Sequence, residues 1–87
     1  MALFMAWSSA DLLADTPGPW RSLLPAAPGL TFVDSDETLS RVYHELKWAL
    51  PENAALSVAA VQGAPKSRRL APGSHSWLRD VVGAGTS

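Results

Sequence analysis

The residues best suited to bind a charged ligand lie in a basic segment in the last third of the chain. Lys66, Arg68 and Arg69 follow an apolar run that is typical of a strand, and a predicted helix comes after them. Backbone N–H groups at the start of a helix favour a bound anion. However, the segment Gly63–Ser67 lacks the glycine spacing of a phosphate-binding loop, and Pro65 has no N–H to donate. The basic segment therefore predicts either an anion-binding site or a solvated charged surface.

A second candidate site lies on one face of the helix that is predicted to end before Pro51. At 100° per residue, Arg41, His44 and Trp48 project on the side opposite the apolar stripe of this helix. Tryptophan and arginine are enriched among the residues that dominate protein–protein binding energy. Two interpretations stay open: Trp48 packs under a neighbouring element of the same chain, or the three residues form a partner-binding surface.

The chain carries no recognisable motif for metal-dependent or nucleophilic catalysis. His44 and His75 are the only histidines, and they do not form a close-spaced metal-binding pair. There is no cysteine, and no serine lies in a G-x-S-x-G elbow. We expect no metal and no cofactor. Either histidine could still act as a general base, so the sequence does not decide whether the protein is an enzyme.

A strand–helix–strand unit must position these candidate residues. The apolar runs 30–33 and 56–61 predict two strands, and Asp34 stands three residues before Glu37, a spacing that predicts a capping box at the helix start. The helix has an apolar stripe that we expect to face the core. Its members are Leu39, Val42, Tyr43, Leu46 and Leu50. Because strand–helix–strand crossovers normally return parallel, we expect parallel strands that are neighbours or are separated by the first strand.

The flanking segments predict one further strand, a crossover with short helical pieces and a last helix. Residues 2–7 are apolar on both faces, as in a central strand, and residues 8–29 predict a proline-rich crossover with short helical pieces at 9–14 and 19–24. A last apolar helix face is expected before a frayed tail, 83–87. That face consists of Trp77, Leu78, Val81 and Val82.

The order of these elements predicts one α/β (or α+β) domain over residues 1–82. We expect a small three-stranded sheet, mixed or parallel, packed by a central amphipathic helix and a short C-terminal helix. With 87 residues, 47% of them hydrophobic and 17% charged, the chain has the composition of a folded domain. A core of this size without disulfides is marginally stable, so we expect a homodimer.

The net charge bears on the class of partner, and the first residues of the chain bear on its location. A net charge of -1 argues against nucleic acid as a partner, because phosphate binding needs many basic residues. Met1–Trp7 lacks the basic flank and apolar length of a signal peptide, and no later run approaches the length of a membrane span. We expect a cytoplasmic protein that does not bind a membrane.

Two functions stay open. The first is a protein–protein interaction domain with Trp48, His44 and Arg41 as its contact surface. The second is a protein that binds a small anionic molecule, or a small enzyme, with a pocket between residues 8–29 and the basic segment. A pocket lined by Trp20 or a histidine would favour the second function, and an exposed patch around Trp48 would favour the first.

Overall fold

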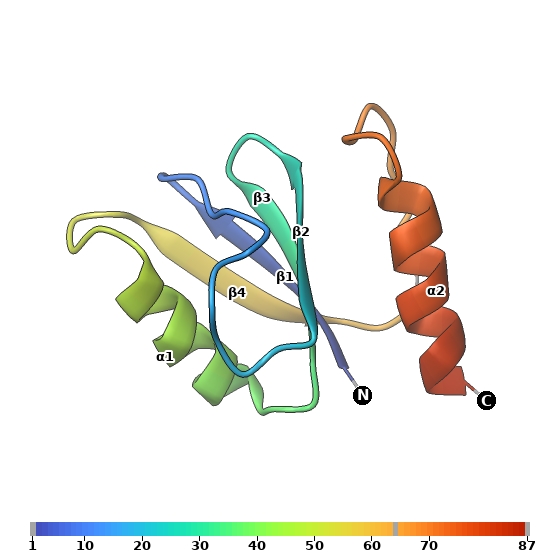
Figure 1. The fold of residues 1–87 in the computed structure, drawn as a ribbon, viewed down its shortest axis with the longest axis horizontal. Helices are drawn as coiled ribbons and strands as arrows, with labels where there is room; N and C mark the ends of the chain where they lie inside the picture. Colours follow the sequence, from blue (N-terminus) through green and yellow to red (C-terminus); the bar gives the residue numbers. More distant parts are fainter. Residues whose placement is uncertain (1, 64, 87) are drawn as a thin grey trace.

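The computed structural model describes residues 2–63 and 65–86, which form one antiparallel sheet of four strands and two helices. The elements are β1 (Ala2–Ser8), β2 (Ser22–Ala27), β3 (Leu30–Ser35), α1 (Leu39–Ala49), β4 (Leu56–Val61) and α2 (Ser74–Thr86). The strand order is β2-β3-β1-β4, so the first strand of the chain lies inside the sheet (Figure 1).

The two helices cover opposite faces of the sheet (Figure 1). Side chains alternate along β1, so that Phe4 and Ala6 pack toward Val42 and Leu46 of α1. Leu3 points to the other face, into a second cluster that includes residues of α2. The residues buried in this second cluster are Leu3, Ala26, Phe32, Leu78 and Val81. Met5 and Trp7, on the same face as Leu3, are 39% and 52% exposed, so the second apolar face of β1 is covered only at the start of the strand.

The predicted class, a small domain of strands and helices, is confirmed, but a three-stranded mixed or parallel sheet is wrong. The sheet has a fourth strand, and every neighbouring pair is antiparallel. The strands at 2–7 and 56–61 are confirmed as β1 and β4. Since β3 and β4 both run antiparallel to β1, they are parallel to each other and separated by the first strand, one of the two expected arrangements.

The additional strand is β2, which begins at Ser22, within the segment predicted to be helical at 19–24. It forms a hairpin with β3 through a turn at Pro28–Gly29, where Gly29 has a φ of 77°. A left-handed conformation of this kind favours glycine. Pro25 disfavours a helix interior but is tolerated in an edge strand, which β2 is. The predicted helix at 9–14 is also wrong, because these residues form bends and a turn, with Leu12 buried under α1.

The predicted capping box at Asp34 and Glu37 is wrong as well. β3 continues to Ser35, and Thr38 caps α1 by accepting a hydrogen bond at Oγ1 from the Arg41 N–H, at 3.2 Å. Asp34 instead faces Arg21 across the sheet. The helix start therefore lies four residues later than the acidic pattern indicates.

The apolar stripe of α1 is buried only in part. Val42 and Leu46 are fully buried, and Leu50 is buried at the end of the helix. Leu39 is 41% exposed in the first turn, and Tyr43 lies at the edge of the stripe and is half-buried. The expectation that all five residues face the core is therefore wrong for Leu39.

Helix α2 begins at Ser74. Its Leu78 and Val81 are buried against the sheet, as their spacing predicts. The helix extends to Thr86, past the domain end expected at Val82, and that boundary stays a prediction. Neither described helix is long and apolar enough to cross a membrane.

Candidate functional site

The exposed face of α1 carries the three residues predicted to bind a partner. Trp48 is 70% exposed, and His44 and Arg41 are exposed one and two turns before it, respectively. The rings of His44 and Trp48 lie 6.1 Å apart, and Arg41 Nε contacts Glu45 Oε1 at 3.2 Å. No described element covers Trp48, so the interpretation that it packs within the chain is not what the structure has.

A shallow cavity of about 350 Å³ adjoins Trp48 between α1 and the start of β4. The residues that line it are Tyr43, Lys47, Trp48, Leu50, Pro51, Glu52, Ala54 and Leu56. Aromatic and aliphatic side chains form its walls, and Lys47 and Glu52 bring one charge of each sign. The arrangement suits an apolar group with polar contacts at its rim.

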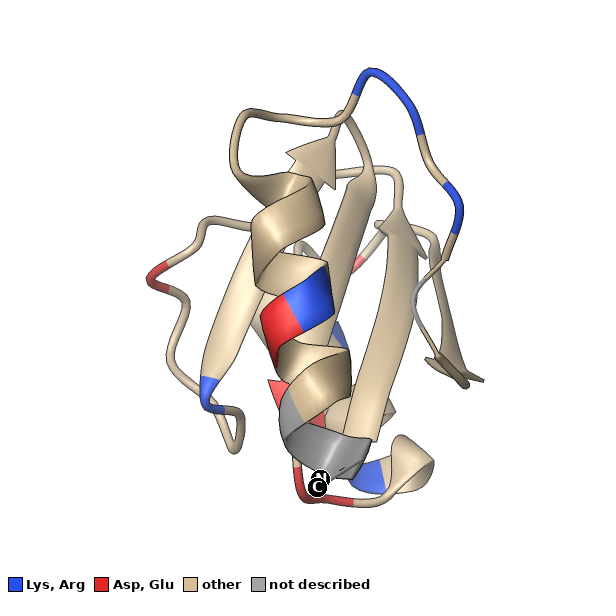
Figure 2. Cartoon of the chain, turned by 90° about the vertical axis from the view of Figure 1, so that its right-hand side faces the viewer, with Lys and Arg blue, Asp and Glu red and all other residues tan. Residues whose placement is uncertain are grey.

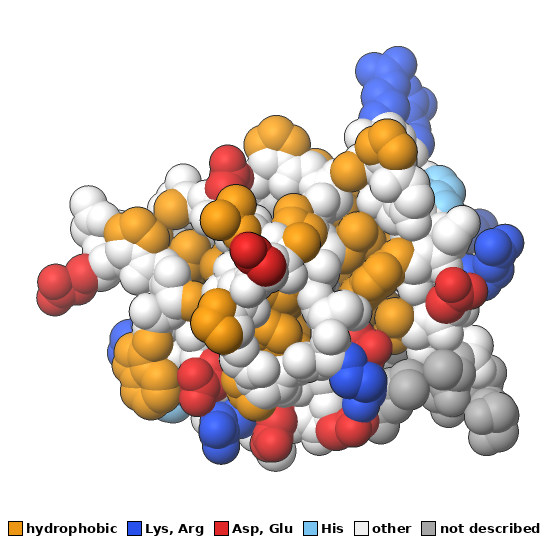
Figure 3. Space-filling view, viewed as in Figure 1, with side chains coloured by type: hydrophobic (Ala, Val, Ile, Leu, Met, Phe, Trp, Pro, Cys, Tyr) orange, Lys and Arg blue, Asp and Glu red, His pale blue; other side chains and the backbone are white. Residues whose placement is uncertain are grey.

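The basic segment forms an exposed loop before α2. Figure 2 shows its Lys and Arg positions along the loop, and in Figure 3 basic side chains stand out from the body of the molecule at the same place. Lys66, Arg68 and Arg69 are all exposed, and none of them forms an ion pair with another described residue. Arg69 has a φ of 61°, a conformation that non-glycine residues seldom adopt.

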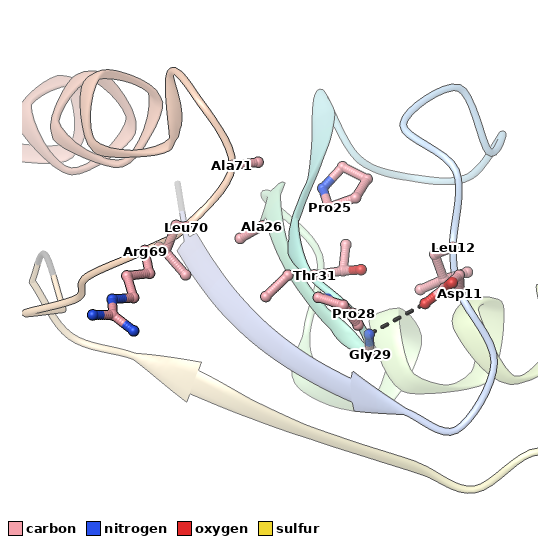
Figure 4. Close-up of a pocket in the computed structure, with 11 residues that line it drawn as sticks. Asp11, Leu12, Pro25, Ala26, Pro28, Gly29, Thr31, Arg69, Leu70 and Ala71 are labelled. Atoms are coloured by element: carbon pink, nitrogen blue, oxygen red, sulfur yellow. Dashed lines mark hydrogen bonds between the residues drawn. The ribbon is translucent and has the colours of Figure 1, made fainter.

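A cavity of about 490 Å³ lies between the 8–29 region and this loop, where the sequence predicts a pocket. Arg69 lies at its wall together with Asp11, Pro25 and Gly29, whereas Lys66 and Arg68 do not line it. Asp11 Oδ1 accepts a hydrogen bond from the Gly29 N–H at 3.2 Å. Figure 4 shows the Arg69 guanidinium directed away from Asp11 and Gly29. Neither Trp20 nor a histidine lines this cavity.

The two histidines lie on different helices. His44 lies on α1 and His75 at the start of α2, on opposite sides of the sheet, and both are exposed. The neighbours of the His44 ring are the rings of Tyr43 and Trp48, and neither can orient a general base as a carboxylate would. Within residues 2–63 and 65–86, no group of three or more metal-binding side chains comes together.

Sequence reasoning missed an ionic cluster at the open end of the β2–β3 hairpin. Arg21 contacts the carboxylates of Asp34 and Asp36, and its own N–H donates to the Asp34 carbonyl at 2.7 Å. The hydrogen bond from Arg21 lowers the pKa of Asp36 to about 2. The two aspartates are visible in the sequence, but their spacing indicated a helix start, and Arg21 stood in a segment not expected to pair with them. The contacts of Arg21 with Asp34 and Asp36 join the two ends of the hairpin that lie opposite its turn.

Comparisons with protein-family models, curated proteins and solved structures found no match to this chain. The functional argument therefore rests on the surfaces and cavities described above.

Proposed function

We propose that this protein is a small protein–protein interaction domain, and that the exposed face of α1 with Arg41, His44 and Trp48 is its contact surface. The observation that carries the proposal is the 70% exposure of Trp48. An indole buries a large apolar area when it is covered, and tryptophan and arginine are the residues that most often dominate interface energies. A second copy of the chain is the first candidate partner, because the core is small and lacks disulfides.

The surroundings of Trp48 support this proposal. The cavity beside Trp48 could receive an apolar side chain, and Lys47 and Glu52 provide a polar rim. The cavity near the basic segment lacks the Trp20 or histidine lining that would favour small-molecule binding or catalysis. We further propose a cytoplasmic location, which fits a chain without cysteine.

The test is the effect of Trp48→Ala on association. We expect this change to weaken self-association, measured by analytical ultracentrifugation, by roughly 30-fold or more, since an interface hot spot contributes ~2 kcal/mol or more. The fold should persist, because Trp48 has little buried area to lose. Leu13→Ala is the control, since Leu13 is another large hydrophobic residue with 67% exposure and belongs to the crossover, not to α1. Loss of fold in the Trp48 variant, or equal effects of both changes, would contradict the proposal.

A second candidate function is binding of a small anion in the cavity beside Arg69. The observation that favours it is the position of this cavity, between the crossover and the basic loop. Asp11 at the opposite wall opposes it, because a carboxylate repels an anion. Titration with inorganic phosphate, followed by NMR, tests this function. Arg69→Gln should abolish the chemical-shift changes that phosphate causes, and Asp11→Asn should enlarge them. If neither substitution alters these chemical-shift changes, phosphate does not bind in this cavity.

A further inference from the structure

The outer edge of β4 carries backbone groups that no other described strand pairs with. β4 is the last strand of the sheet and has β1 as its one neighbour. In an antiparallel pair, successive residues point their N–H and C=O groups alternately toward and away from the neighbour. The Ser9 N–H donates to the Ala55 carbonyl at 3.0 Å, so residue 55 and every second residue after it face β1. Leu56, Val58 and Ala60 therefore direct their N–H and C=O groups outward.

The two edges of this sheet differ in their protection against pairing. Folded proteins block free edges with proline, charged residues or bulges. The β2 edge has Pro25 and a register irregularity between Pro25 and Ala27. β4 has the sequence Leu-Ser-Val-Ala-Ala-Val, without charge, proline or glycine. Such a strand is an open template for another strand.

We infer that two copies of the chain pair through their β4 strands, antiparallel and in continuous register, with Val58 opposite Val58 of the second copy. The inference rests on the proposed function and names its partner as a second copy. In this register Leu56 lies opposite Ala60 of the other copy, so all three outward-facing residues find a pairing partner. A shift of two residues in either direction would leave one of them unpaired.

The side chains along β4 are self-complementary in this register. On the α1 face, the large Leu56 meets the small Ala60 of the second copy at each end, and the two Val58 side chains meet in the centre. On the other face, Ser57 meets Ala59 of the second copy. No charged side chain lies on either strand, so a two-fold pairing brings no like charges together.

The same pairing reaches the surface around Trp48. The cavity beside Trp48 includes Leu56, the residue at which β4 begins. In the paired arrangement, the second copy leaves its β4 strand at Val61, close to this end. Because directly opposed residues of a strand pair point to the same face, the α1 helices of the two copies lie on one face of the joined sheet. Leu56 therefore links the edge of β4 to the surface around Trp48.

Cysteine cross-linking tests the register, because the natural chain has no cysteine. Ser57 and Ala59 are both exposed, so Ser57→Cys and Ala59→Cys should leave the fold intact. As a non-hydrogen-bonded pair across the two copies, their Cα atoms would lie about 4.5 Å apart, within disulfide range. We expect a mixture of the two variants to form a disulfide-linked dimer on mild oxidation. Either variant alone should stay largely monomeric under denaturing electrophoresis, since like residues are offset by about 7 Å along the strand.

A charge at the edge gives an independent measurement. Ala60 is exposed, and Ala60→Lys should raise the dimer dissociation constant roughly tenfold or more, because each copy then loses one cross-strand pair. Ala71→Lys is the matched control, since Ala71 is exposed and bonds to Ala26 at the opposite edge of the sheet. Far-UV circular dichroism should be unchanged in both variants.

The outcomes separate this inference from the proposed function. Failure of the mixed cysteine pair to cross-link, or cross-linking of each variant alone, would overturn the β4 pairing, as would unchanged association of Ala60→Lys. If Trp48→Ala still weakens association in that case, the α1 face remains the contact surface and only the edge pairing is wrong. If the wild-type protein is monomeric at every concentration, the second copy is not the partner and the pairing is wrong.

Discussion

The Asp34 carboxylate receives two hydrogen bonds from Arg21, at 2.7 Å from Nη2 and 3.2 Å from Nε, across 13 positions of sequence. Asp34 is buried at the end of β3, and Arg21 lies directly before β2. A two-pronged contact of this kind fixes direction as well as distance. It joins the open end of the hairpin, opposite the turn at Gly29.

Removal of Arg21 should therefore destabilise the fold. We expect Arg21→Gln to lower the free energy of unfolding by roughly 1–3 kcal/mol, because it leaves a buried carboxylate without its charged donor. Urea denaturation measures the change. Arg41→Gln is the control, since its pair with Glu45 is exposed and should contribute less than about 1 kcal/mol. Equal losses of unfolding free energy in the two variants would show that the Arg21 contact stabilises the fold no more than an exposed ion pair does.

The acid behaviour of the protein should depend on Asp36. Arg21 lowers the pKa of Asp36 from 3.8 to about 2. A carboxylate with a lowered pKa in the folded state stabilises that state above pH 3.8, and the contribution disappears as the pH falls toward 2. NMR titration of the Asp36 carboxyl carbon in the folded protein should give this lowered value. In the Arg21→Gln variant the midpoint should move up toward 3.8, and an unchanged midpoint would contradict the assignment.

The hairpin turn should tolerate only glycine at position 29. Gly29 has a φ of 77°, and a Cβ atom there would lie 2.9 Å from the Ser8 carbonyl oxygen. We expect Gly29→Ala to cost about 1–2 kcal/mol for the left-handed backbone alone, and more for the contact. Gly63→Ala separates the two effects, because Gly63 has a φ of 78° and no atom within 4 Å of its added Cβ. In thermal unfolding, the Gly29→Ala variant should have the lower melting temperature of the two. The reverse order would contradict a close contact between the added Cβ atom and the Ser8 carbonyl oxygen.

Substitutions on the apolar stripe of α1 should destabilise the fold according to how deeply each residue is buried. Leu46 is fully buried, and Leu46→Ala should cost about 2–5 kcal/mol. Leu39 is 41% exposed in the first turn, so Leu39→Ala should cost about 1 kcal/mol or less. Chemical denaturation of both variants measures the difference. A large loss of stability in the Leu39→Ala variant would indicate that Leu39 is buried after all, as the sequence pattern predicts.

Local patterns predicted the central elements of this fold. The two-sided apolar run of β1, the run of β4 and the spacing of Val42 and Leu46 are each determined by which face an element buries. These elements can therefore be predicted from the local sequence, without knowing which other elements pack against them. The side of the helix that carries Arg41, His44 and Trp48 follows from the same geometry.

Features that depend on distant residues were not predicted. β2 contains Pro25, which weakens any strand pattern and is tolerated only because β2 lies at an edge. Asp34 and Glu37 have the spacing of a cap, but Arg21 engages Asp34 from the neighbouring strand. The pocket position near the basic segment was predicted, whereas the direction of Arg69 depends on a left-handed backbone at that residue.

The place of β1 inside the sheet also affects how the chain can be made. β1 leaves the ribosome before the other three strands of this sheet, so both of its neighbours are synthesised later, and its Leu3 lies opposite Val61. Pairing between such distant segments slows folding and leaves strand edges open in the meantime. A nascent or truncated chain that stops before Leu56 presents β1 with one side unpaired, and its Met5 and Trp7 are already partly exposed in the finished fold. The interval before β4 is synthesised is thus the stage at which this protein is most prone to aggregate.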